Sequence, residues 1–138
     1  MRYLLDTNVL SEAIKTIPNK KVMTMVERHQ DEIVTAAPVW HELQFGYQRL
    51  PQSRKREIIA SFLNDILRRT MLILPYDKRA AEWHAKERAR LSSRGVAPSF
   101  VDGQIASIAG VNDLILVTRN IVDFKRFSKL KLENWHNA

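Results

Sequence analysis

The chain has 138 residues, a formal net charge of +7 and no cysteine. This length predicts a single domain over residues 1–138, able to bury about two-thirds of the surface of the unfolded chain. The lack of cysteine excludes a disulfide framework and a thiolate metal site. No segment reaches the ~18 uninterrupted apolar residues of a membrane span. The early acid Asp6 argues against a signal peptide, so we expect a cytoplasmic protein without a membrane segment.

The positive charge is unevenly distributed along the chain. Residues 1–48 carry 5 basic and 6 acidic residues, a balance of −1, whereas residues 49–138 carry 17 basic and 9 acidic residues, a balance of +8. A basic domain favours a polyanionic partner, such as nucleic acid or a strongly acidic protein. Solvated helix faces would give the same count, so charge alone leaves both interpretations open.

Short apolar runs alternate with amphipathic segments along the chain. The expected strands are Arg2–Leu5, Glu32–Ala36, Met71–Leu74, Leu114–Val117 and Leu130–Glu133. The expected helices are residues 7–15, 19–30, 38–50, 53–69, 77–93, 99–110 and 123–127. Asn19 and Asp77 are suited to begin helices, Pro38 fits a first helical turn, and Gly95 is suited to end one. This alternation predicts an α/β fold, a three-layer α/β/α domain with a short, mostly parallel sheet of four to five strands.

The predicted helix at residues 53–69 has two chemically distinct faces. Its apolar stripe consists of Ile58, Ile59, Phe62, Leu63, Ile66 and Leu67. Its other face carries Arg54, Lys55, Arg56, Arg68 and Arg69. These basic residues either contact phosphates or only keep the helix soluble, and the sequence leaves the two open.

Several polar side chains fall where a buried element ends or faces the core. Asp6 directly follows the first predicted strand, and Asn120 and Asp123 follow the run Leu114–Val117. The carboxyl end of a buried parallel strand is where open α/β sheets place their ligands. Asp102 lies on the apolar face of its helix, where a carboxylate is unfavourable unless it is hydrogen-bonded, paired or bound to a cation. These positions therefore predict a shared polar site.

Glu42 joins this set from the edge of the apolar stripe in the helix that begins near Pro38. Taken singly, Glu42 fits an ordinary exposed glutamate, and Asp6 fits a helix cap. Taken together, the acids resemble an oxygen-ligand site for Mg²⁺ or Mn²⁺, because crowded carboxylates need a cation to offset their mutual repulsion. Thr7 and Thr118 either support such a site through hydrogen bonds or have local capping roles. In a basic protein this combination is typical of phosphodiester cleavage.

Other motifs with a defined chemistry are missing from the sequence. The four glycines form no phosphate-binding loop, and neither GxSxG nor HExxH occurs. The four histidines are scattered along the chain. Nucleotide-binding, serine-hydrolase and zinc-peptidase functions therefore lose their main support.

Five segments carry a family resemblance. They are LLDTNVLSE (Leu4–Glu12), VWHELQFG (Val39–Gly46), SFVDGQIASIA (Ser99–Ala109), LVTRNIVDF (Leu116–Phe124) and LKLENW (Leu130–Trp135). In this order and spacing the sequence resembles a PIN-domain ribonuclease of the VapC toxin type nearly from end to end. The resemblance implies a PIN-like fold and a magnesium- or manganese-dependent endoribonuclease whose metal-binding acids are Asp6, Glu42 and Asp102. Asn120 occupies the position where many PIN domains carry a fourth catalytic acid.

The same resemblance implies partners and products. It implies a VapB-like antitoxin that blocks the site, operator DNA bound only through the toxin–antitoxin complex, and a homodimer. We place the antitoxin in the groove between the first helices and the hairpin at residues 39–69. The expected substrate is RNA, with tRNA as the target class, cleaved to 5′-phosphate and 3′-hydroxyl ends. Asn120 can bind a metal through its carbonyl oxygen but adds no charge, so a second metal would bind more weakly or be absent, and Asp123 would compensate only in part.

Two other functions stay open at this point. A catalytically silent PIN module, acting with a DNA-binding partner in transcriptional regulation, is supported by Asn120 in place of an acid. A haloacid-dehalogenase-like phosphatase also begins with an acid after its first strand. That class needs a second aspartate two residues later, where this chain has Asn8.

Overall fold

The centre of the molecule is a parallel sheet, seen here in a computed structural model that describes residues 1–137. Its strands are β1 (Tyr3–Leu5), β2 (Ile33–Ala36), β3 (Ile73–Leu74), β4 (Ile115–Val117) and β5 (Lys131–Glu133). They form a five-stranded sheet in the order β3-β2-β1-β4-β5, and every neighbouring pair is parallel. The predicted mostly parallel sheet is confirmed, and β1 lies at its middle with β2 on one side and β4 on the other.

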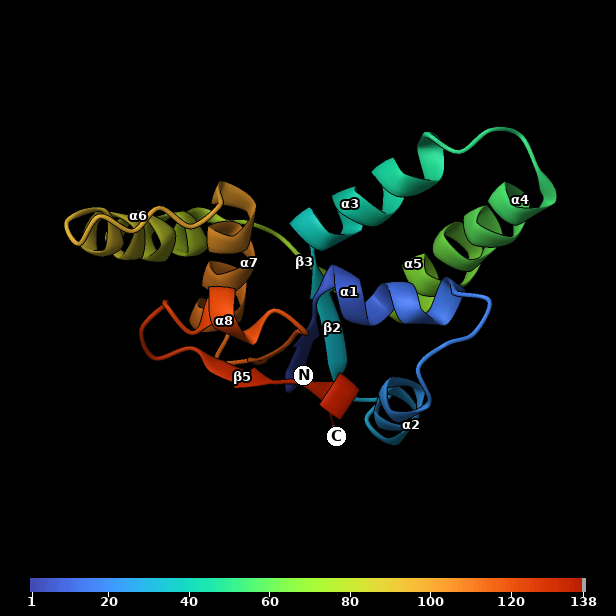
Figure 1. Cartoon of the computed structure of the whole chain (residues 1–138), viewed down its shortest axis with the longest axis horizontal. Coiled ribbons are helices and arrows are strands. Elements are labelled where there is room, and N and C mark those ends of the chain that lie inside the picture. The colour runs from blue at the N-terminus through green and yellow to red at the C-terminus, as the bar shows by residue number, and fades with distance from the viewer. Residues whose placement is uncertain (138) are drawn as a thin grey trace.

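Helices cover both sides of this sheet (Figure 1). They are α1 (Thr7–Leu10), α2 (Lys20–Arg28), α3 (Ala37–Gln48), α4 (Arg54–Ser61), α5 (Arg68–Thr70), α6 (Lys78–Ser92), α7 (Phe100–Val111) and α8 (Ile121–Phe124). Figure 1 shows α6, α7 and α8 on one side of the strands, and α1, α2, α4 and α5 on the other. The predicted three-layer architecture is therefore confirmed.

Two helices begin at the capping residues that the sequence predicts. The Asn19 side chain accepts a hydrogen bond from the Val22 backbone N–H at 3.1 Å, and Asp77 does the same for Ala80 at 2.9 Å. Each cap satisfies a backbone N–H that has no partner within its own helix. After α6 the chain turns at Gly95, whose φ of +74° is a conformation that glycine adopts without steric cost.

The segment predicted as one helix over residues 53–69 is divided in the structure. A π-helical segment, Phe62–Leu67, separates α4 from α5. A π turn holds more residues than an α turn, so it changes which side chains face the core. Ile59, Leu63 and Leu67 are buried, but Ile58 and Ile66 remain 58 % and 52 % exposed. The continuous six-residue stripe was therefore only partly correct, and two of its apolar residues face outward.

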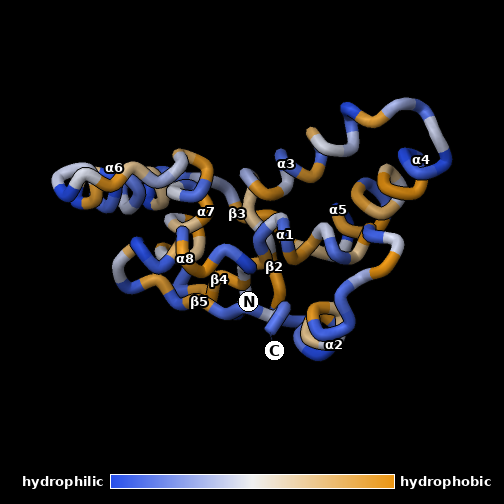
Figure 2. Tube along the Cα trace, viewed as in Figure 1, coloured by the Kyte–Doolittle hydropathy of each residue, from blue (hydrophilic) through white to orange (hydrophobic). Residues whose placement is uncertain are grey.

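The core lies along the sheet and between it and the helices. Figure 2 shows hydrophobic residues in the strands and along α7, whereas much of α6 is hydrophilic. Trp135, near the end of the chain, is buried beside Tyr3, with ring centroids 5.2 Å apart. The last described residues therefore pack against the first strand. Among residues 1–137, no helix has both the length and the apolar character needed to cross a bilayer.

Candidate active site

Asp6 and Thr118 meet at the carboxyl ends of the two central strands. The pairing of β1 with β4 places Leu5 opposite Val117, so the next residue of each strand lies at the same edge of the sheet. The Asp6 backbone N–H donates to the Val117 carbonyl oxygen at 3.0 Å. The Thr118 hydroxyl donates a hydrogen bond to Asp6 Oδ2 at 2.8 Å. The sheet register thus fixes the orientation of the first candidate acid.

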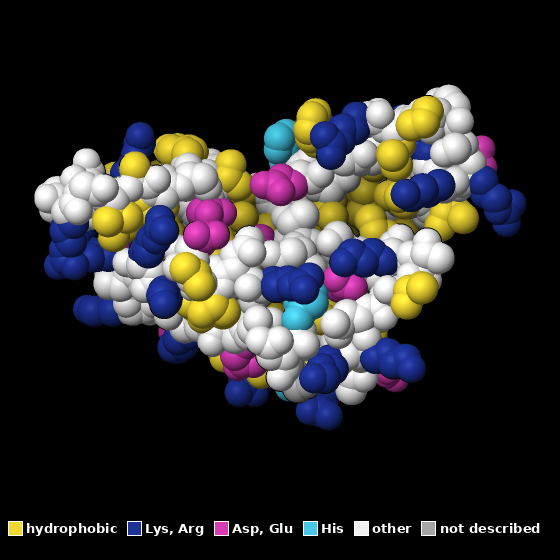
Figure 3. Space-filling model, in the orientation of Figure 1, with side chains coloured by type: hydrophobic (Ala, Val, Ile, Leu, Met, Phe, Trp, Pro, Cys, Tyr) yellow, Lys and Arg dark blue, Asp and Glu magenta, His cyan; other side chains and the backbone are white. Residues whose placement is uncertain are grey.

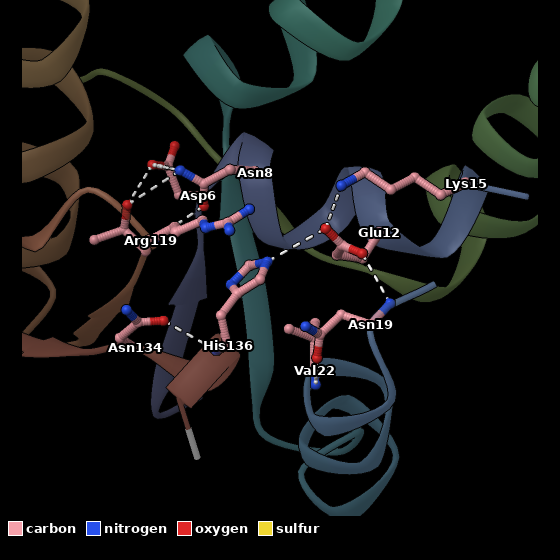
Figure 4. A network of polar contacts seen from close by, with 10 residues as sticks. Asp6, Asn8, Glu12, Lys15, Asn19, Val22, Arg119, Asn134 and His136 are labelled. Atoms are coloured by element: carbon pink, nitrogen blue, oxygen red, sulfur yellow. Dashed lines mark hydrogen bonds and ion pairs between the residues drawn. The ribbon is translucent and has the colours of Figure 1, made fainter. Parts of the chain in front are cut away.

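Backbone groups and Asn8 hold the surrounding loops in place (Figure 4). The Thr7 backbone N–H donates to Asp6 Oδ1 at 2.8 Å, so Asp6 is also the N-terminal cap of α1. Asn8 Oδ1 accepts a hydrogen bond of 3.1 Å from the Arg119 backbone N–H. The Thr118 hydroxyl oxygen accepts one of 3.0 Å from the Asn120 backbone N–H. The loop after β4 is therefore attached to the start of α1.

The carboxylates of four elements influence one another across this edge. Asp6 is only 6 % exposed, and burial is the main cause that raises its pKa; hydrogen bonds from Thr118 and Thr7 oppose this effect. The negative charges of Asp102 and Glu42 raise the pKa of Asp6 further. For Asp102, burial and then the charge of Asp123 raise the pKa. Negative charge therefore accumulates here, as in a site that a cation would stabilise.

The predicted site residues take different positions in this arrangement. Asp102 lies half-buried in the first turn of α7, and Glu42 is exposed on α3. Asn120 precedes α8 and is exposed, and its side chain does not cap that helix. Asp123 follows in α8, and its negative charge acts on Asp102. Figure 3 shows acidic side chains around the middle of this face, with lysine and arginine on either side.

The donor chemistry fits a hard divalent cation, although the ligands are not gathered into a closed cage. Oxygen atoms of carboxylates, an amide and hydroxyls are the ligands that Mg²⁺ and Mn²⁺ prefer. The Thr7 hydroxyl oxygen, next to Asp6, is buried and has no hydrogen-bond partner among residues 1–137. Within the same range, no three His, Asp or Glu side chains form a ready metal-binding group. The assignment of Asp6, Glu42, Asp102 and Asn120 as site residues thus stays a prediction, with a fitting donor set.

A second buried acid near this edge was not predicted. Glu12 is 3 % exposed, and its carboxylate accepts a hydrogen bond of 2.9 Å from the Asn19 backbone N–H. It also pairs with Lys15 and lies 3.3 Å from His136 Nε2 (Figure 4). The hydrogen bond with Lys15 is the main cause that lowers the pKa of Glu12, to about 2. These contacts attach His136 to the segment that follows α1, so Glu12 joins residues near the two ends of the described chain.

A histidine behind Asp102 was also missed. His84 is buried in α6, and its Nδ1 lies 2.9 Å from the Tyr76 hydroxyl. Its ring packs so closely on α7 that a Cβ added at Gly103 would lie 2.0 Å from His84 Nε2. Burial lowers the pKa of His84, so the ring is neutral near pH 7. His84 thus supports the helical turn that carries Asp102, and its only signal in the sequence is the glycine beside that acid.

Comparison with known proteins agrees with this geometry. Residues 3–130 match the family described as PIN domain. "Ribonuclease VapC2" of Rickettsia felis is 32 % identical over 136 residues, which cover 98 % of each chain. "tRNA(fMet)-specific endonuclease VapC" of Salmonella typhimurium is 26 % identical, again over 98 % of each chain. A crystal structure of VapBC2 from Rickettsia felis bound to a DNA fragment from their promoter superimposes with a TM-score of 0.83 and 31 % identity, covering 98 % of this chain and 99 % of that one. The chain therefore belongs to the PIN-domain family.

Proposed function

We propose that this chain is a metal-dependent endoribonuclease, the VapC-type toxin of a toxin–antitoxin pair. The observation that carries the proposal is the coupling of Asp6, Asp102 and Glu42 at the carboxyl edge of the sheet. This acidic centre lies in a chain whose residues 49–138 have a net charge of +8, as expected for a protein that binds a polyanion. The ribonuclease names of its relatives over nearly the whole chain support the same activity.

In this proposal each residue at the site has a defined task. Asp6, Glu42 and Asp102 hold Mg²⁺ or Mn²⁺, and the Asn120 amide oxygen contributes without adding charge. A cation held by these residues would supply Lewis-acid polarisation of a phosphoryl oxygen and would lower the pKa of a bound water. Thr118 keeps the Asp6 carboxylate in one orientation through its hydrogen bond of 2.8 Å. Arginine and lysine side chains around the acids neutralise the RNA backbone, and hydrolysis leaves 5′-phosphate and 3′-hydroxyl ends.

We place the antitoxin in the groove between the 3₁₀ helix Ser11–Ile14 and helices α3 and α4. One hollow there has a volume of about 510 Å³, and its lining combines apolar residues with Lys15, Lys55 and smaller polar residues, Thr7 and Glu42 among the polar ones. A neighbouring hollow of about 760 Å³ extends along α4 to the exposed Ile58 and Ile66. An amphipathic segment bound in this groove would cover the apolar side chains and reach Glu42, which explains how binding would also block the site.

The proposal extends to the assembly and its target. The chain acts in the cytoplasm as a homodimer, and it contacts operator DNA only within the antitoxin complex. The promoter-bound structure of a relative supports such a complex. We infer tRNA as the substrate class, which the name of the relative from Salmonella typhimurium supports.

The decisive experiment is incubation of antitoxin-free protein with total tRNA in Mg²⁺ or Mn²⁺, compared with EDTA and with Asp6→Asn. Discrete fragments that require the metal and disappear in the variant would support the proposal, and mapping their ends would identify the target. If tRNA stays intact, the same comparison is made with ribosomal RNA. If the protein cleaves neither tRNA nor ribosomal RNA, the nuclease assignment is overturned.

A catalytically silent PIN module that acts with a DNA-binding partner is the second candidate. Its supporting observation is Asn120, a neutral residue exposed beside the acids where a carboxylate would complete the charge of the site. Tight antitoxin and operator binding, without cleavage of either RNA, would favour this function.

A further inference from the structure

A hollow of about 480 Å³ lies on the side of the sheet opposite to the antitoxin groove. It is bordered by the end of α6, the following turn at residues 95–97, and Arg126, which comes just after α8. Three arginines, Arg90, Arg94 and Arg126, line it. Figure 1 shows α6 and α8 together on this side, apart from α3 and α4.

One of the three arginines belongs to the framework. Arg90 binds the carboxylate of the buried Glu87 through two hydrogen bonds, of 2.8 and 3.0 Å. Its Nη2 also donates to the Arg126 carbonyl oxygen at 2.9 Å. Glu87 accepts further hydrogen bonds from the backbone N–H and the hydroxyl of Ser128. The charge of Arg90 is thus neutralised, and its side chain fixes the backbone at Arg126.

The other two arginines have no such partner. Arg94 and Arg126 are exposed, and neither forms an ion pair with any residue in the range 1–137. Both guanidinium groups are therefore free to donate to an anion bound in the hollow. The planar guanidinium presents a fork of N–H donors that can bind two oxygens of one phosphate at once, which a lysine ammonium cannot do.

The hollow adjoins the candidate acids. Arg126 is three positions after Asp123, one turn along the same short segment. The positive charge of Arg126 also acts on Asp102, whose pKa it lowers in opposition to burial. Arg126 therefore borders the hollow and at the same time lies within electrostatic reach of Asp102.

We propose that Arg94 and Arg126 form a subsite for a backbone phosphate of the RNA strand, next to the phosphate that is cleaved. The inference rests on the proposed ribonuclease function and adds the path that the substrate takes. RNA fits better than an acidic protein segment, because two arginines without an ion-pair partner border the hollow and because the groove assigned to the antitoxin lies elsewhere. The subsite binds the backbone without reading bases, so it contributes to affinity and not to sequence choice.

The test is the salt dependence of RNA binding in EDTA, where cleavage is absent. Binding of labelled tRNA is titrated at several salt concentrations for wild type, Arg94→Gln, Arg126→Gln and the double variant. Arg28→Gln, which removes an equal charge from exposed α2, is the matched control. Arg126→Gln keeps the backbone carbonyl that Arg90 binds, and melting temperatures verify folding.

Each lost phosphate contact is expected to reduce the slope of log affinity against log salt by about 0.7 to 0.9. In the cleavage assay, Arg94→Gln should raise KM while kcat stays near the wild-type value. The subsite would be overturned if the salt slopes for RNA binding by the Arg94 and Arg126 variants equalled that of Arg28→Gln. It would also be overturned if these variants lost affinity for the antitoxin while their RNA slopes stayed unchanged. Failure of the wild type to bind or cleave RNA would instead count against the ribonuclease function itself.

Discussion

The hydroxyl of Thr118 and the carboxylate of Asp6 are joined by a hydrogen bond of 2.8 Å across 112 positions of sequence. Thr118 also accepts from the Asn120 backbone N–H, so one hydroxyl connects an acid to the loop that carries the neutral fourth site residue. Thr118 and Asp6 are both buried. A single side chain thus couples the orientation of the acid to the conformation of that loop.

Replacing this hydroxyl should therefore weaken both the fold and the activity. Thr118→Val keeps the volume but removes the donor to Asp6, and a hydrogen bond to a charged group contributes about 1.5–3 kcal/mol. Cleavage should fall because the carboxylate loses its fixed orientation and its pKa rises further. Urea unfolding and RNA cleavage measure the two effects. Thr118→Ser keeps the hydroxyl and should retain most activity; equal activity of the Val variant would contradict this role.

Asp6→Asn and Asp102→Asn should each abolish cleavage without unfolding the protein. Burial raises the pKa of both carboxyl groups, which means that the ionised form is unfavourable in the folded state without metal. A neutral amide removes this cost, so the metal-free melting temperature at pH 7 should stay equal or rise. Asp31→Asn, on an exposed turn, is the control. Cleavage that survives in either site variant would refute the metal assignment.

Substitutions of two helical glycines, Gly103 and Gly46, should have opposite effects on stability. Gly103→Ala forces a methyl group to within 2.0 Å of His84 Nε2, and overpacking of this kind costs about 1–3 kcal/mol. Gly46→Ala in α3 meets nothing within 4 Å, so the better helix propensity should stabilise the fold by up to about 1 kcal/mol. Thermal unfolding compares the two. His84→Ala should partly rescue Gly103→Ala, and additive effects would show that the two residues are not coupled.

Charge in the apolar groove should release the antitoxin without affecting cleavage. Ile58→Asp places a carboxylate on a side chain that is 58 % exposed and lines the larger hollow. Loss of an interface anchor costs about 2 kcal/mol or more, roughly a 30-fold weaker complex. Binding of the cognate antitoxin is measured by calorimetry. Leu72→Asp, 57 % exposed and outside the groove, should bind normally. If both variants bind equally well, the antitoxin lies elsewhere.

Two buried glutamates should make the fold sensitive to acid. Hydrogen bonds with Lys15 and Arg90 are the main causes that lower the pKa of Glu12 and Glu87, each from 4.5 to about 2. A lowered pKa stabilises the fold above pH 4.5, and this contribution is lost as the pH falls towards 2. Each group contributes at most about 3 kcal/mol. Between pH 7 and pH 2, the free energy of unfolding should fall less in Glu12→Gln and in Glu87→Gln than in the wild type. In the exposed control Glu27→Gln it should fall as much as in the wild type.

Much of the fold was predictable because local signals determine it. The five strands occur where apolar runs were found, and the caps Asn19 and Asp77 act as predicted. Asp6 and Asp102 were identifiable because a carboxylate beside a buried strand or on an apolar helix face needs a compensating interaction. The structure brings these acids within electrostatic reach of each other, while their metal-binding role stays a prediction.

What the sequence did not reveal depends on partners distant in the chain. In the sequence Glu12 looks like an ordinary helix residue, because its partner His136 lies 124 positions later. Asn8 and Arg119 are likewise joined only through the β1–β4 pairing. The π-helical segment Phe62–Leu67 has no distinctive composition in the sequence. Ile58 and Ile66 therefore looked like core residues when they are surface residues.

The place of β1 in the sheet also has a consequence for synthesis on the ribosome. The first strand made is the central one, and its β4 partner begins only at Ile115. A nascent chain can pair β1 with β2 early, but the other edge of β1 stays open until most of the protein has emerged. Asp6 then lacks Thr118, and the last residues that pack against Tyr3 are still missing. The hydrogen bond that orients Asp6 can consequently form only near the end of translation.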